Sequence, residues 1–163
     1  MASSAILVLT TGGTIDKNYF DALSEYQIVD SGIPALLAEA RVAAAFRIEE
    51  VCRKDSLELT PADRAEIARR IVAAPETRVV ITHGTDTMTD TAQALAGIAD
   101  KTIVLTGALS PARFAETDAP FNLGMAFAAA QVAPPGVYIA MSGQVFNGLK
   151  VRKDRDAGRF VAV

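Results

Sequence analysis

Short apolar runs rich in β-branched residues alternate with helical segments along most of the chain, and this alternation constrains the fold more than any other feature. Strands are expected at residues 5–10, 46–52, 78–82, 102–106 and 136–141. Helices are expected within the intervening segments, at residues 33–45, 61–74, 86–99 and 121–131. Because several strands are nearly all apolar, both of their faces should be covered. The sequence therefore predicts an α/β fold with three layers, a mainly parallel sheet between two layers of helices.

Length, charge and hydropathy narrow the function classes. The 163 residues show no internal repeat or linker, so one domain is expected over residues 1–163. Basic residues are interspersed with acids at a net charge of −3, which argues against a nucleic-acid partner. The longest apolar tract, residues 123–141, is interrupted by Gln131 and two prolines, and the N-terminal apolar run is too short for a signal peptide. A cytoplasmic protein without a membrane partner is expected.

The single cysteine and the single histidine are both expected to be structural. Cys52 lies in the apolar stretch FRIEEVC and is expected to be a small buried hydrophobe. No GxSxG motif or matching Ser and Asp residues accompany His83, so loop packing is its expected role. No group of His, Cys, Asp and Glu residues has metal-ligand spacing, and no metal is expected.

Hydroxyl side chains gather where two of the predicted strands end. The first strand is followed by TTGGT, residues 10–14, and the third by the threonine-rich residues 82–91. Ligands of open α/β sheets bind beyond the carboxyl ends of the strands, and glycines let the backbone approach a ligand closely. From these residues alone two interpretations stay open. Either the hydroxyls satisfy loop amides and Asp86 is a helix N-cap, or the loops and a helix N-terminus bind an anionic group.

A threonine hydroxyl becomes a nucleophile only when a base removes its proton. The C-terminal segment QVFNGLKVRKDRD offers Lys150 and Lys153, and a lysine can act as such a base when its pKa is lowered. Surface solvation is the alternative for both lysines.

Four segments resemble the asparaginase family of threonine amidohydrolases: LTTGGTID, ITHGTDTMTDTA, TGALSPARF and MSGQVFNGLKVRK. The first two look like the two signatures of the family, and the last looks like the stretch that carries its catalytic lysine. The resemblance runs from about Ala5 to Lys153. In particular, TIDKNYFDALSEYQI looks like the short, one-domain branch, which corresponds to the N-terminal asparaginase domain and its α/β/α fold.

The resemblance implies a set of catalytic residues. Thr14, directly after the two glycines, matches the nucleophile that forms the acyl-enzyme, and the other hydroxyls around it would bind or activate. Tyr19 matches the tyrosine that contacts that hydroxyl, with Tyr26 as the alternative. Lys153 matches the lysine beside the second threonine, with Lys150 as the alternative register.

The resemblance also implies a substrate-binding set. Within the HGTD motif, Gly84 and Thr85 are expected to contact the substrate, and Thr85 is also the second threonine. Asp86 matches the acid that binds the α-amino group of the substrate, and it is counted with the catalytic residues as well. Ser56 matches the serine that holds the α-carboxylate, and Ala108 matches a backbone carbonyl that receives the side-chain amide.

The function implied in this way is hydrolysis of L-asparagine to L-aspartate and ammonia by a double displacement on threonine, without a cofactor. Backbone amides near the two threonines would stabilise the oxyanion. Glutamine or a broader set of amides is the first alternative, because one methylene changes discrimination by only about 1–3 kcal/mol. A non-catalytic amino-acid-binding module is the second.

Assembly is also expected. Many family members carry a C-terminal domain that completes the site of a neighbouring subunit, whereas the resemblance here ends ten residues before Val163. A homo-oligomer is predicted, with its interface near the glycine- and charge-rich segments 107–120 or 142–163, the second of which should contain a terminal hairpin.

Overall fold

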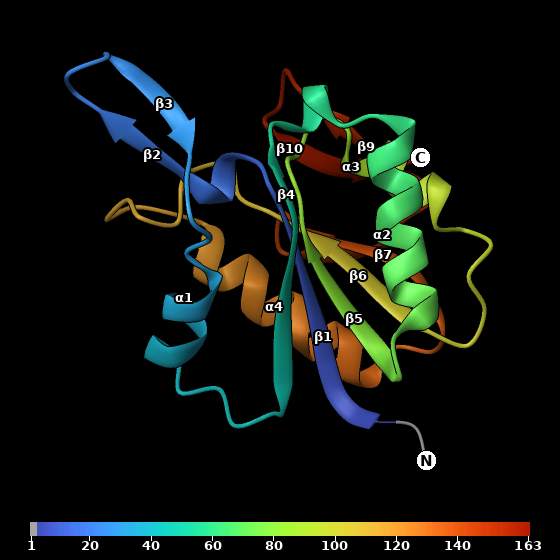
Figure 1. Cartoon of the computed structure of the whole chain (residues 1–163). Helices are drawn as coiled ribbons and strands as arrows, with labels where there is room; N and C mark the ends of the chain where they lie inside the picture. The colour runs from blue at the N-terminus through green and yellow to red at the C-terminus, as the bar shows by residue number, and fades with distance from the viewer. Residues whose placement is uncertain (1–2) are drawn as a thin grey trace.

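A computed structural model describes residues 3–163, and its centre is a six-stranded sheet (Figure 1). The strands are β1 (Ser3–Gly12), β4 (Phe46–Lys54), β5 (Glu76–Thr82), β6 (Thr102–Thr106), β7 (Gly136–Met141) and β8 (Gln144–Asn147). Their order across the sheet is β4-β1-β5-β6-β7-β8. The first five strands in this order are parallel, and β8 pairs antiparallel with β7. The five strands expected from the sequence are the five parallel ones.

Helices cover both faces of the sheet. α1 (Ile33–Glu39) and α4 (Ala119–Val132) pack on one face, and α2 (Pro61–Ala73) and α3 (Met88–Ala94) pack on the other. Alternate residues of β1 supply the two cores. Ile6 and Val8 join the cluster with α1 and α4, while Leu7 and Leu9 join the cluster with α2 and α3. The predicted three-layer α/β/α architecture is therefore confirmed.

Capping residues and backbone conformation determine where the helices begin and end. α2 begins where the sequence predicts, because Thr60 and Asp63 form a reciprocal capping box and Pro61 fills the first helical position. α1 and α3 end earlier than the helical patterns of residues 33–45 and 86–99 suggest. α1 ends at its C-cap Ala40, and the next residue, Arg41, adopts left-handed backbone with φ of 51°, which stops a right-handed helix. α3 ends at its C-cap Leu95 and continues into a turn over residues 95–97.

Two hairpins lie beyond the carboxyl ends of the parallel strands (Figure 1). The first pairs β2 (Lys17–Phe20) with β3 (Glu25–Ile28), and it was not expected from the sequence, because each strand has only four residues and β2 shows no alternation of polar and apolar residues. The second pairs β9 (Val151–Asp154) with β10 (Arg159–Ala162) and confirms the terminal hairpin expected within residues 142–163. Within the described part of the chain, no helix is long and apolar enough to cross a membrane.

Candidate active site

Three loops meet at the carboxyl edge of the sheet through backbone contacts that only glycine allows. Gly13, after β1, has φ of 82°, and a Cβ atom there would lie 2.4 Å from the Gly84 nitrogen. A Cβ atom on Gly84, after β5, would lie 2.6 Å from the Cβ of Ser56, which follows β4. Both distances are far inside van der Waals contact. The glycines therefore bring the TTGGT segment, the HGTD segment and the Ser56 turn together.

Thr14 opens the short 3₁₀ turn Thr14–Asp16 at this junction. It is half-buried and lines a surface hollow of about 330 Å³. The other residues around this hollow are Lys17, Tyr26, Leu109, Ser110, Pro111 and Phe114.

The two candidate tyrosines differ in their relation to Thr14. Tyr19 and Tyr26 face one another across the β2–β3 hairpin, with ring centroids 5.1 Å apart. Tyr26 lines the hollow beside Thr14, whereas Tyr19, which is 42% exposed, does not. The structure thus brings the alternative tyrosine, Tyr26, together with Thr14.

Lys153 on β9 reaches the HGTD segment. Its Nζ donates hydrogen bonds to Thr85 Oγ1 at 2.8 Å and to Asp86 Oδ1 at 2.9 Å. A second cation, Arg155, lies 3.6 Å from the same Asp86 oxygen. Lys150 is exposed in the loop before β9. Of the two lysines weighed from the sequence, the structure brings Lys153 to Thr85 and Asp86.

The Ser56 turn is held from three sides. The Asp55 side chain caps it by accepting from Leu57 N, and Asp55 is paired with Lys17 at 2.9 Å. The Thr87 hydroxyl donates to the Ser56 carbonyl at 2.7 Å. Ser56 itself is 1% exposed, so its hydroxyl is buried within this junction.

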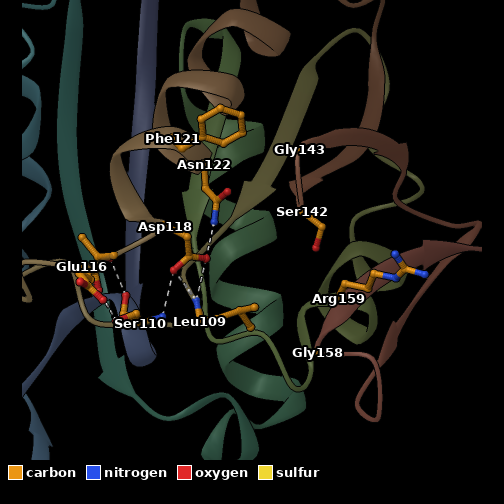
Figure 2. Close-up of a pocket in the computed structure, with 11 residues that line it drawn as sticks. Leu109, Ser110, Glu116, Asp118, Phe121, Asn122, Ser142, Gly143, Gly158 and Arg159 are labelled. Atoms are coloured by element: carbon orange, nitrogen blue, oxygen red, sulfur yellow. Dashed lines mark hydrogen bonds between the residues drawn. The ribbon is translucent and has the colours of Figure 1, made fainter.

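Ala108 lies in the loop after β6 and is 1% exposed. The next two residues, Leu109 and Ser110, line the hollow beside Thr14. Both of their amides donate to the Asp118 carboxylate, which also accepts from the Asn122 side chain (Figure 2). Asp118 therefore fixes the loop that carries Ala108.

Some of the remaining polar residues are structural. Thr11 is fully buried, and its hydroxyl donates to the Thr82 carbonyl of the neighbouring strand at 2.8 Å, a bond that ties β1 to β5. Cys52 is half-buried rather than fully buried, and burial raises the pKa of its thiol. Its Sγ lies 3.4 Å from the Thr11 carbonyl oxygen.

His83, directly after β5, is fully buried, as the loop-packing role expected from the sequence requires. Its ring bonds to the Gly84 carbonyl and to the Thr91 hydroxyl, each at 2.7 Å. Burial lowers its pKa to about 4, so the imidazole is neutral at physiological pH.

Lys17 and Arg155 belong to the site but were missed from the sequence. Each stands within three residues of a predicted site residue, Thr14 or Lys153, and each pairs with an acid that is distant along the chain. Their proximity in sequence to Thr14 and Lys153 was the only feature that could have indicated a place in the site. It is a weak indication, because charged residues in loops are usually solvated. Among residues 3–163, no three His, Cys, Asp or Glu side chains form a group that could hold a metal ion.

Comparison with known proteins gives one consistent family. The family model described as "Asparaginase, N-terminal" matches residues 5–160. An L-asparaginase from Thermococcus kodakarensis is 34% identical over 165 residues, which is 94% of this chain and 48% of that protein. A glutaminase-asparaginase from Pseudomonas fluorescens biotype A is 30% identical over 162 residues, covering 91% of this chain and 45% of that protein.

Solved structures agree with the sequence relatives. The thermostable L-asparaginase from Thermococcus kodakarensis has a TM-score of 0.85 at 30% identity, with coverage of 98% of this chain and 51% of that one. A probable cytoplasmic L-asparaginase from Campylobacter jejuni has a TM-score of 0.83 at 29% identity, with coverage of 98% and 53%. The chain spans about half the length of the relatives it matches.

Proposed function

Since the chain belongs to the asparaginase family, we propose that it hydrolyses the side-chain amide of L-asparagine to give L-aspartate and ammonia. The observation that carries the proposal is the contact of Lys153 with both Thr85 and Asp86, beside the glycine junction that presents Thr14. A site that only binds an amino acid has no need of a lysine held on a threonine hydroxyl. Hydroxyl, ammonium and carboxylate together are the groups that an acyl transfer uses.

The proposed reaction has two displacements. The Thr14 oxygen attacks the amide carbon, and its proton is transferred to the departing nitrogen, which leaves as ammonia. Water then attacks the acyl-threonine, which releases aspartate and returns a proton to Thr14. In both steps the oxyanion accepts hydrogen bonds from backbone amides near Thr14 and Thr85, each typically worth about 3 kcal/mol. The Lys153–Thr85 contact supports a role for Lys153 in orienting the second threonine and in proton transfer.

We assign the substrate groups to the binding residues as follows. Asp86 receives the α-amino group, and the Ser56 turn beside Gly84 receives the α-carboxylate. The side-chain amide lies toward Ala108 and the hollow that Thr14 lines. We assign the tyrosine that acts beside Thr14 to Tyr26 rather than to Tyr19, because Tyr26 lines that hollow and Tyr19 does not.

Glutamine hydrolysis is the second candidate, and the similarity to a glutaminase-asparaginase favours keeping it. The test is ammonia release from asparagine, from glutamine and from buffer alone. Release from asparagine or glutamine supports the amidase. Binding of aspartate without any release would support an amino-acid-binding module and overturn the proposal.

We further propose that residues 1–163 act as one catalytic domain that assembles with copies of itself. The two segments expected at the interface lie together around a second hollow of about 610 Å³ (Figure 2). Ser110, Glu116 and Phe121 line one side, and Ser142, Gly143 and Arg159 line the other. Leu109 and Phe121 expose 45% and 66% of their surface there, which favours burial against a partner. Similarity to the probable cytoplasmic L-asparaginase from Campylobacter jejuni favours a cytoplasmic location.

A further inference from the structure

The only histidine of the chain directly precedes the Gly84–Thr85 peptide, and both of its ring nitrogens are bonded. Nδ1 lies 2.7 Å from the Gly84 carbonyl oxygen, and Nε2 lies 2.7 Å from Thr91 Oγ1. A carbonyl oxygen can only accept, so Nδ1 carries the proton of the neutral ring. Nε2 must then accept the proton of the Thr91 hydroxyl.

Arg64 of α2 fixes the direction of this series of bonds. Its Nε donates to Thr91 Oγ1 at 3.0 Å, and its guanidinium also donates to the Leu59 carbonyl at 3.2 Å. Because a guanidinium cannot accept, the Thr91 hydroxyl must accept from Arg64 and donate to His83. Each donor in the series is therefore fixed: Arg64 donates to Thr91, Thr91 donates to His83, and His83 donates to the Gly84 carbonyl.

The last bond sets the orientation of a peptide plane. The described peptides are all trans, so the Gly84 carbonyl and the Thr85 N–H point in opposite directions. Thr85 is 7% exposed, yet within residues 3–163 its N–H has no hydrogen-bond acceptor. Most buried amides are paired, so this amide is available to a ligand. The close approach of Gly13 to the Gly84 nitrogen and Cα brings the loop that carries Thr14 next to the residue whose carbonyl His83 holds.

We infer that His83 is a positioning residue, which holds the Gly84 carbonyl so that the Thr85 N–H faces the reacting carbon and donates to the oxyanion. The inference rests on the amide hydrolysis proposed above and adds a role for a residue outside the reacting groups. An oxyanion donor contributes most when it is oriented before the charge develops, because no energy is then spent on turning it. The neutral imidazole supplies this orientation from the buried side of the peptide.

Two substitutions separate positioning from packing. In His83→Asn the amide nitrogen can take the place of Nδ1 and still donate to the Gly84 carbonyl. In His83→Gln the longer side chain reaches toward Nε2 and Thr91 instead, and the donor to Gly84 is lost. We expect His83→Gln to lower kcat for asparagine by about 10- to 100-fold, below the full worth of one oxyanion donor, with KM within about 3-fold. His83→Asn should keep kcat within about 5-fold of the unsubstituted protein.

Equal losses of kcat in the two variants, or an unchanged kcat in His83→Gln, would overturn the inference. A melting temperature measured for each variant separates loss of fold from loss of turnover.

A second measurement does not require turnover. In the ¹⁵N-labelled protein, the Thr85 amide resonance should shift downfield on addition of L-aspartate, and this shift should shrink in His83→Gln but persist in His83→Asn. If the unsubstituted protein binds aspartate but hydrolyses neither amide, the proposed function fails while this shift still reports the orientation of Thr85. A Thr85 amide that does not respond to bound aspartate contradicts the inference, whatever the activity.

Discussion

The Nζ atom of Lys153 lies 2.8 Å from Thr85 Oγ1, although the two residues are 68 positions apart in the sequence. β9 carries the lysine, and its pairing with β10 holds that strand beyond the carboxyl edge of the sheet. The lysine side chain is 18% exposed and also pairs with Asp86, so solvent screens the contact only partly. The C-terminal hairpin thus supplies the cation that contacts Thr85.

Substitution of Lys153 tests whether this contact matters for turnover. Lys153→Met should lower kcat by about 10²- to 10⁴-fold, the usual worth of one positioned acid–base group. Because Nζ donates to both Thr85 and Asp86, we expect Lys153→Arg to recover part of the loss by keeping the charge and the donors. A loss in Lys153→Arg as deep as in Lys153→Met would instead indicate a general base.

Lys150→Met is the matched control for this test, since Lys150 is exposed and only three residues away. Its kcat should stay within a few-fold of the unsubstituted protein. Collapse of activity in Lys150→Met with near-normal Lys153→Met would move the assignment to Lys150.

Thr14→Ala tests the nucleophile. The variant should fold and bind aspartate but hydrolyse asparagine at least ~10³-fold more slowly, because the covalent route is lost. Thr11→Val is the control: it removes the bond to the Thr82 carbonyl and should cost about 1 kcal/mol of stability while turnover is largely kept. Retention of a tenth of the activity in Thr14→Ala, with abolition in Thr85→Ala, would exchange the roles of the two threonines.

A charge at the hollow of Figure 2 should weaken assembly. Phe121 lines this hollow and is 66% exposed, so Phe121→Glu would bury an unpaired carboxylate in the proposed interface. Light scattering at micromolar concentration should show a dimer or larger species for the unsubstituted protein and monomer for Phe121→Glu. Val132→Glu, at the far end of α4 and 82% exposed, should leave assembly intact. A fully active monomer would defeat the prediction.

His83 should make folding stability depend on pH. Burial holds its pKa at about 4 in the folded protein, whereas the ordinary value of 6.5 applies to the unfolded chain. The unfolded chain therefore binds an extra proton as pH falls through 6.5, and the stability that His83 contributes above that pH is progressively lost toward pH 4. The full loss is about 3 kcal/mol. Arg64 and Asp90 are the charged groups that act on the ring, and they oppose one another.

The measurement is the free energy of unfolding in denaturant between pH 7 and pH 4. The difference between the unsubstituted protein and His83→Asn should shrink by about 3 kcal/mol over this range, because the variant lacks the titrating ring while the carboxylates are common to both. Parallel curves for the two proteins would show that His83 does not titrate in this way.

The alternation of apolar strands and amphipathic helices determined the layers of the fold from the sequence alone. Side chains alternate across a strand, so a strand that is apolar at every position must be covered on both faces, as Ile6 and Leu7 of β1 are. Local chemistry also set the start of α2, where Thr60 and Asp63 cap the helix. The glycine-flanked threonines marked the edge of the sheet at which the loops converge.

Only the tertiary structure decided which of several equivalent side chains converge there. Lys153 on β9 reaches Thr85, whereas Lys150 lies in the loop before that strand. Tyr26 lines the hollow beside Thr14 and its direct strand partner Tyr19 does not, a difference that no spacing in the sequence encodes. The two strands of the β2–β3 hairpin have four residues each, too few for a periodic pattern to predict them. The role inferred for His83 likewise depends on a peptide plane whose orientation no residue pattern encodes. Periodicity reports which side of an element is buried. Contacts between distant loops depend on how the finished sheet brings their ends together.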